Sequence, residues 1–243
     1  KTHFDKKALW DSVDRLPAKL QNVNFTSVPA RMTYGSTAGI AVASTEEAIK
    51  LREAGIKADI LMMSSTAIEQ ELENMLKNNI TITIGSTEAK EALIKIIKRV
   101  NKKPKIHIKI DTGFGRYGYL YTDTERIIKD IKELQKFAII EGIFSHFSTS
   151  FYKEKWTNLQ YERFLEVLKT IEEHKINIPI KHISNSSAFI RFPQMSLSAV
   201  RIGSAFLGRV AVANKLGLKK IGYLESEISE IKTLPKGWNI GYS

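Results

Sequence analysis

The feature that most constrains the fold of this chain is a repeated alternation of short apolar runs with segments of helical periodicity. The apolar runs at residues 39–43, 59–63, 80–84, 105–110, 138–144, 180–183 and 200–202 are predicted to be strands. An eighth strand is predicted from Val23 to Val28, after a first helix from Lys7 to Leu20. Strands that alternate with helices indicate a parallel sheet. Eight of them favour a parallel (β/α)8 barrel of the TIM type over an open sheet, and no GxGxxG segment supports a dinucleotide-binding fold.

Local signals predict the ends of several helices. Ser44 and Glu47 have the spacing of a capping box, and Gly55 follows as a helix stop. Thr157 and Gln160 have the same spacing, so a second capping box is predicted to begin a helix that runs to residue 174. In the helix after the second strand, the apolar side chains in phase are Ile68, Leu72, Met75 and Leu76.

Two features interrupt this pattern. Only residues 36–38 separate Tyr34–Gly35 from the strand at residue 39, whereas a parallel crossover needs about a dozen residues or more. Either the first strand is wrongly placed, or a segment is missing from the sequence. Beyond residue 223 the chain changes character, with a turn signal at Leu234–Pro235–Lys236–Gly237. We therefore expect a barrel domain over residues 1–222 and the start of a truncated C-terminal β domain over residues 223–243.

Composition narrows the classes of function. The chain of 243 residues has no cysteine, which excludes disulfides and cysteine-ligated zinc, and no metal site is predicted. We expect no membrane span and no signal peptide. The lack of cysteine is compatible with a reducing compartment, and a cytoplasmic protein is expected. The net charge is +11. Nucleic-acid binding is one explanation, but lysines interleaved with glutamates, as in Glu88–Glu91, favour solvated helix faces and no nucleic-acid partner.

Polar residues follow the predicted strands at their carboxyl ends, where barrels carry functional side chains. They include Lys109, Asp111, Arg116, His146, Asn185, Ser186, Arg201, Gly203 and Ser204. The small residues at 185–186 and 203–204 favour a phosphate site, with ordinary helix capping as the alternative. His146 is either a buried loop residue or a catalytic one. Arg201 needs a partner, which is either a carboxylate or a pyridine nitrogen.

Five segments, in their order along the chain, resemble the alanine racemase family. They are Ala43–Ile56 in the second βα unit, His107–Gly118 around a lysine that the family carbamylates, Glu141–Ser148, His182–Ala188 in the phosphate loop, and Val200–Gly203. The similarity covers nearly the whole chain, and the motifs are specific as a set. The resemblance implies an enzyme that uses pyridoxal phosphate to remove and return the α-proton of an amino acid.

The resemblance also implies how the cofactor would be held. Ser186 and the Gly203–Ser204 backbone would bind the phosphate in the loop that Asn185 begins, and Tyr34 would add a contact. Arg201 would face the pyridine nitrogen, with His146 beside it. A cationic arginine there keeps that nitrogen unprotonated, which moderates the electron sink and favours racemisation over side reactions.

Three further residues gain catalytic roles from the same resemblance. Arg116 would reach the phenolic oxygen of the cofactor, and carbamylated Lys109 would be the anion that holds Arg116. In the family, a tyrosine of the C-terminal domain serves as the second base in the partner subunit's site. Tyr242 lies at the corresponding place, and its alternative is a strand tyrosine without a chemical role.

One departure from the family lies at the site itself. The family attaches its cofactor to a lysine at the end of the first strand, and Ala30 occupies that position here. Arg31 cannot replace the lysine, because a guanidinium does not form the required covalent link. Either the sequence omits segments of a longer racemase, or it is a truncated or engineered barrel, or it is a natural relative that binds the cofactor without catalysis.

We expect a pyridoxal-phosphate-dependent racemase, dimeric when complete, that interconverts L- and D-alanine for cell-wall synthesis. Serine, lysine and ornithine remain possible substrates, since no sequence feature fixes the side chain. A non-catalytic barrel of the cofactor-homeostasis type is the main alternative, and Ala30 supports it. A basic amino-acid decarboxylase is less favoured, because such enzymes usually place an acidic residue at the pyridine nitrogen, where Arg201 stands.

Overall fold

The computed structural model describes residues 3–4, 39–220, 222–223 and 226–238. Several predictions fall elsewhere. The helix at Lys7–Leu20, the strand at Val23–Val28 and the site positions Ala30, Tyr34 and Tyr242 lie outside the described residues.

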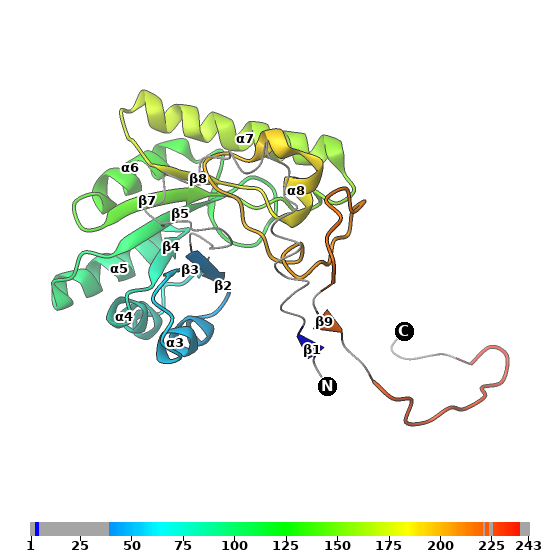
Figure 1. Ribbon diagram of the computed structural model, residues 1–243. Coiled ribbons are helices and arrows are strands. Elements are labelled where there is room, and N and C mark those ends of the chain that lie inside the picture. The colour runs from blue at the N-terminus through cyan, green and yellow to red at the C-terminus, as the bar shows by residue number, and fades with distance from the viewer. Residues whose placement is uncertain (1–2, 5–38, 221, 224–225, 239–243) are drawn as a thin grey trace.

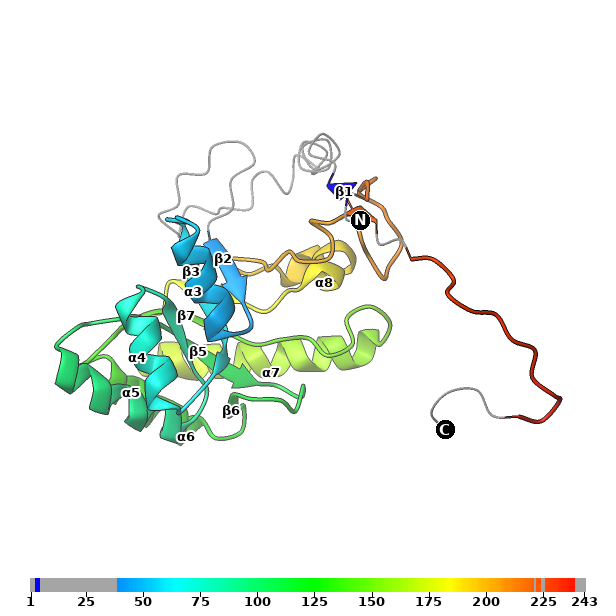
Figure 2. The same ribbon diagram turned by 90° about the horizontal axis from the view of Figure 1, so that it is seen from below.

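Six parallel strands form the centre of the structure. They are β2 (Gly39–Val42), β3 (Asp59–Ser65), β4 (Thr81–Ile84), β5 (Lys105–Asp111), β7 (Ile139–Phe144) and β8 (Ile180–His182). Their order in space is their order in the chain, and a short strand β6 (Tyr119–Leu120) pairs with β5. This order is that of a barrel, because doubly wound sheets reverse direction. Figures 1 and 2 show the sheet curling with helices along its outer face, so the described residues form the half-barrel of a parallel α/β barrel.

A helix follows nearly every strand. The helices are α3 (Thr45–Glu53), α4 (Glu69–Lys77), α5 (Thr87–Val100), α6 (Thr124–Leu134), α7 (Glu154–Glu173), α8 (Ser186–Arg191) and the 3-10 turn η2 (Pro193–Met195). The predicted capping box at α3 is confirmed, because the Ser44 hydroxyl accepts the Glu47 N–H at 3.2 Å and the Glu47 carboxylate accepts the Ala43 N–H at 3.1 Å. None of the helices in the described ranges combines the length and hydrophobicity that a membrane crossing needs.

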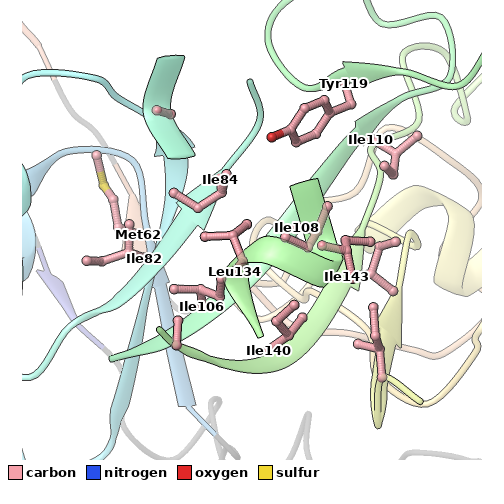
Figure 3. Packing of buried hydrophobic residues seen from close by; sticks show 14 of the residues in the cluster. Met62, Ile82, Ile84, Ile106, Ile108, Ile110, Tyr119, Leu134, Ile140 and Ile143 are labelled. Carbon is pink, nitrogen blue, oxygen red and sulfur yellow. The ribbon is translucent and has the colours of Figure 1, made fainter. Parts of the chain in front are cut away.

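The hydrophobic core lies between the sheet and these helices. Figure 3 shows Ile106 and Ile108 of β5 near Leu134 of α6, with Ile110 farther along the strand, and all four are fully buried. Alternate residues of a strand point to opposite faces, so the polar residues of β5 share the other face, inside the curl of the sheet. Strand β5 is buried on both faces, yet the side chains on its inner face are polar. The barrel interior is therefore the candidate location of a functional site.

Two predictions about helix starts are wrong. Helix α7 begins at Glu154, three residues before Thr157, and no side chain caps its first turn. Thr157 lies inside the helix, and Gln160 bonds to loops far away in the sequence. A local spacing cannot distinguish a cap from such long-range partners. Ile68 is also misassigned, because it precedes α4 and is 60% exposed, whereas Leu72, Met75 and Leu76 are buried.

The predicted last strand at residues 200–202 is not formed as a strand. Within the described residues, the segment at 199–202 pairs with β8 only through a single parallel bridge between His182 and Ala199. The Ser198 hydroxyl accepts the N–H of Lys181 at 2.6 Å, and a side chain that takes a backbone donor competes with regular pairing. The Arg201 N–H nevertheless donates to the Ser184 carbonyl at 3.0 Å, so Arg201 still lies beside the end of β8.

Beyond the barrel, β9 (Gly222–Tyr223) pairs antiparallel with β1 (His3–Phe4). The predicted turn near Pro235 is confirmed, since the Trp238 N–H donates to the Pro235 carbonyl at 3.2 Å. The strand-like runs expected on either side of this turn are not strands within residues 226–238.

Candidate active site

Strand β5 supplies the first side chains of the candidate site. His107, Lys109 and Asp111 alternate along it with isoleucines, and all three are buried. Gly142 on the neighbouring strand β7 gives His107 its space, because a Cβ at that position would lie 2.4 Å from the imidazole. Phe144 of β7 then stacks on His182 of β8, with ring centroids 4.8 Å apart and planes inclined by 12°. The neighbouring strands thus place the polar side chains of β5 and His182 of β8 in one cluster inside the barrel.

Arg201 is the centre of this cluster. Its Nη1 donates to His182 Nδ1 at 2.6 Å, and its Nη2 donates to the carbonyls of Ser145 and Ile183 at 2.8 and 3.1 Å. Nη2 also lies 3.2 Å from His146 Nδ1. Burial lowers the pKa of Arg201 to about 10, so it stays cationic at neutral pH. Its Nε is buried without a hydrogen-bond partner among the described residues, which leaves one donor free for a ligand.

The contacts of Arg201 fix the tautomers of a buried histidine pair. Because arginine only donates, His182 Nδ1 accepts and His182 Nε2 carries the proton. Nε2 therefore donates to His107 Nδ1 at 3.0 Å. The proton of His107 then sits on Nε2, which lies 3.7 Å from Glu141 Oε2. Burial is the main cause that lowers the pKa of both imidazoles, so both are neutral at neutral pH.

His146 stands at the other side of Arg201. Burial, followed by the charge of Arg201, lowers its pKa to about 3, so His146 is neutral at physiological pH. Its Nδ1 lies 3.2 Å from Arg201 Nη2, and two N–H groups would repel each other at that distance, so the imidazole proton lies on Nε2. The ring meets Phe114 edge to face, with centroids 5.4 Å apart. His146 is therefore oriented as a neutral hydrogen-bond donor.

Lys109 is a buried amine that forms no ion pair within the described residues. Its Nζ donates to the Ile110 carbonyl at 2.7 Å and lies 5.4 Å from the centroid of Phe144. Burial and then the Arg201 charge lower its pKa to about 7. No carboxylate in the described part of the chain comes within ion-pair distance of this nitrogen. The neutral, nucleophilic form of the Lys109 amine is therefore accessible near pH 7.

The loop after β5 carries Arg116. The Asp111 carboxylate shapes this loop by accepting the N–H groups of Gly113, Phe114 and Gly115 at 2.8 to 2.9 Å. The exposed guanidinium of Arg116 lies over Phe114 and Tyr117, with its Cζ 4.4 and 4.8 Å from the ring centroids. Its charge contributes to lowering the pKa of Lys109. Lys109 and Arg116, which were predicted to be partners, thus lie near each other. Both are cationic when Lys109 is protonated, and a modification of Lys109 would be needed to give the pair opposite charges.

The predicted phosphate loops also meet. The Ser186 hydroxyl accepts the N–H groups of Gly203 and Ala205 at 3.0 and 3.2 Å, which joins α8 to the segment after Arg201. Asn185 caps α8 by accepting the Ala188 N–H at 3.1 Å, so the capping alternative describes its side chain. Gly203 and Ser204 are exposed, and a Cβ added to Gly203 would meet nothing within 4 Å. The backbone at Gly203 is therefore open to a ligand.

Several of the predicted site residues contact one another within the described part of the chain. Arg201 contacts His146, and Ser186 contacts Gly203, whereas Tyr34 and Tyr242 lie outside the described residues. The sequence analysis missed His107 and His182. A polar residue repeated at every second position of an isoleucine-rich strand was the signal that could have identified His107. No group of three or more histidine, aspartate or glutamate side chains in the described ranges could hold a metal ion.

Comparisons with known proteins agree with this geometry. Residues 23–210 match the family model "Alanine racemase, N-terminal domain". Among curated proteins, an alanine racemase of Clostridium tetani is 39% identical over 221 residues, which cover 88% of this chain and 56% of that protein. An alanine racemase of Methanococcus maripaludis is 36% identical over 209 residues, 84% of this chain and 56% of that protein.

A solved structure gives the same result. An alanine racemase of Clostridium difficile 630, in complex with cycloserine, superposes with a TM-score of 0.81 at 27% identity. The match covers 96% of this chain and 69% of that chain. The chain thus spans little more than half the length of the curated relatives.

Proposed function

The chain belongs to the alanine racemase family, within its N-terminal domain, and we propose that the protein containing it is a pyridoxal-phosphate-dependent racemase of alanine. The observation that carries the proposal is Arg201, a half-buried cation whose buried Nε has no hydrogen-bond partner among the described residues. The relatives and the solved structures are named as alanine racemases, which supports alanine as the substrate.

The residues present fit pyridoxal phosphate. The unpartnered Nε–H of Arg201 suits a ligand atom that accepts a hydrogen bond, such as an unprotonated ring nitrogen, because an arginine side chain can only donate hydrogen bonds. When bound, the cofactor supplies an electron-withdrawing ring that stabilises the charge left on the α-carbon of an amino acid. His182 and two carbonyls hold the guanidinium, so Arg201 would be positioned to keep that ring nitrogen unprotonated. An acidic residue there would favour the decarboxylase alternative, and Arg201 argues against it.

The phosphate would lie between the two small-residue loops. The exposed Gly203–Ser204 backbone would lie against it with the Ser204 N–H as donor, because the Gly203 N–H already donates to the Ser186 hydroxyl. Ser186 would add its hydroxyl proton, which its two accepted bonds leave available. Asn185 would act indirectly, by capping the helix that begins with Ser186. Tyr34 would contribute the contact that the family resemblance implies.

We propose that Lys109 is carbamylated and that the product holds Arg116. The neutral amine attacks carbon dioxide, forms an N–C bond and releases one proton, leaving an anionic carbamate. The lowered pKa of Lys109 supports this step, because only the unprotonated amine reacts. The modification would replace a like-charged pair by an oppositely charged one, and Arg116 would then be aimed at the phenolic oxygen of the cofactor.

The rest of the activity is a proposal about the whole protein. We propose a barrel over residues 1–222 and a C-terminal β domain that starts at residue 223. Tyr242 would be the second base, acting in the partner subunit's site of a homodimer, with neutral His146 as a donor that orients groups there. The protein would act in the cytoplasm and supply D-alanine for peptidoglycan.

One observation favours a second function. Ala30 stands where the family carries the lysine that binds the cofactor covalently. A protein that truly lacks this lysine would hold pyridoxal phosphate without catalysis, as in cofactor storage or delivery.

The full-length gene product distinguishes the two functions. We expect an absorption band of covalently bound pyridoxal phosphate, a single lysine labelled after borohydride reduction, and interconversion of L- and D-alanine. A full-length protein that binds the cofactor, labels no lysine and leaves alanine, serine, lysine and ornithine unracemised would reject the racemase and support the binding protein.

A further inference from the structure

Helix α7 turns three side chains toward the loops that carry the candidate catalytic residues. Trp156, Gln160 and Arg163 are spaced by four and three residues, so they lie on one face of the helix. One loop follows β5 and carries Arg116, and the other follows β7 and carries His146. The two loops are not consecutive in the chain, so a shared clamp would set the distance between them.

Gln160 contacts both loops with one amide. Its Oε1 accepts the N–H and the hydroxyl of Ser148, both at 3.0 Å. Its Nε2 donates to the His146 carbonyl at 3.2 Å and to Thr112 Oγ1 at 3.4 Å. The side chain is fully buried, and these four contacts use the whole hydrogen-bonding capacity of an amide.

The neighbours of Gln160 reinforce both ends of this clamp. The Arg163 Nη1 donates to the Thr112 carbonyl at 3.1 Å, and the Trp156 Nε1 donates to the Ser148 hydroxyl at 3.0 Å. A Cβ on Gly113 would lie only 2.8 Å from Trp156 Cζ2, so the loop after β5 packs directly against the helix. The Thr112 and Ser145 hydroxyls, 2.8 Å apart, also join the two loops directly.

We propose that Gln160 is a positioning residue: its amide fixes the backbone of His146 relative to the loop that presents Arg116. The inference rests on the proposed racemase, in which both side chains act at one cofactor. Methionine would fill the same volume but make none of the four hydrogen bonds, so both loops would loosen together. A solely structural glutamine would affect stability without changing the two loops selectively.

The test uses the full-length gene product with Gln160→Met and, as a matched control, Thr87→Val. Thr87 donates to Asp130 at 2.7 Å between α5 and α6, so its loss also removes a partly buried bond but away from the two loops. Amide hydrogen exchange is followed by mass spectrometry, together with thermal unfolding and the kcat and KM for alanine. We expect Gln160→Met to accelerate exchange in residues 111–118 and 145–148, and Thr87→Val to leave them unchanged.

We also expect Gln160→Met to lower kcat by about 10- to 100-fold with little change in KM, the scale of a misplacement near 1 Å. Unchanged exchange in either loop, or a lower Tm with unaltered kcat, overturns the proposal. Exchange is measurable without activity, so faster exchange in a protein that does not racemise alanine would retain the clamp and reject only the racemase. If Gln160→Met does not fold, Gln160→Glu is judged by the same exchange criterion, because a carboxylate cannot donate to His146.

Discussion

At the scale of single residues, the free Nε–H of Arg201 gives a direct prediction about cofactor binding. Arg201→Lys keeps the charge, but a lysine cannot donate hydrogen bonds to His182, two carbonyls and a ring nitrogen at once. A hydrogen bond to a charged group is worth about 1.5–3 kcal/mol, so the Kd for pyridoxal phosphate should rise about 10- to 100-fold. Arg52→Lys is the control, because Arg52 donates to four backbone carbonyls near the opposite ends of the strands. Equal Kd values for the two variants in an absorbance titration would contradict the role of Arg201.

Lys109 gives a second prediction at this scale. Its pKa of about 7 means that the neutral amine predominates at pH 8 and the cation at pH 6. Incubation with 13C-labelled bicarbonate should therefore produce a carbamate NMR signal at pH 8 that weakens at pH 6. Lys109→Arg should abolish the signal, because a guanidinium stays protonated. A signal that survives this substitution would place the carbamate elsewhere.

At the scale of elements, the pairing of β5 with β7 depends on Gly142. A methyl group there would meet the His107 ring at 2.4 Å, and overpacking of this kind costs about 1–3 kcal/mol. Gly142→Ala should lower the free energy of unfolding in urea by that amount. Gly203→Ala should change it by less than about 0.5 kcal/mol, because its methyl group would meet nothing within 4 Å. Similar losses in both variants would mean that the close approach of His107 is not what requires glycine.

The elements also show what the sequence could and could not predict. Strands β2 to β5, β7 and β8 and the existence of helices α3 to α7 were predictable because apolar periodicity is a local property, whereas the two-residue strand β6 was not predicted. The role of Gln160 was not, because Ser148, His146 and Thr112 approach it only in the folded chain. The segment at residues 200–202 has the composition of a strand, but Ser198 diverts a neighbouring backbone donor. Arg201 was identified by its position among apolar residues, whereas its partner His182 was not, since its importance depends on a contact 19 residues away.

At the scale of the whole molecule, the buried imidazoles of His107 and His182 and the half-buried imidazole of His146 link stability to pH. Burial lowers the pKa of His107, His146 and His182 in the folded state below the unfolded value of 6.5, to about 3 for His146. The unfolded chain therefore binds more protons, and the free energy of unfolding falls as pH drops below 6.5, down to the folded pKa values. Each histidine contributes a slope of about 1.4 kcal/mol per pH unit.

Urea unfolding of the full-length protein between pH 7 and pH 5 measures this slope. We expect the free energy of unfolding to fall toward pH 5. His182→Asn should reduce its slope against pH by the equivalent of about one bound proton, and should also lower the free energy of unfolding at pH 7. Carboxylates act at lower pH. Burial raises the folded pKa of Asp130, but its bonds to Lys90, Thr87 and Tyr119 lower that pKa overall, so its contribution to the free energy of unfolding is lost below the unfolded value of 3.8. The two effects therefore separate on the pH axis. An unchanged slope in His182→Asn would show that His182 is not buried as a neutral imidazole, and the hydrogen-bond chain from Arg201 to Glu141 would have to be redrawn.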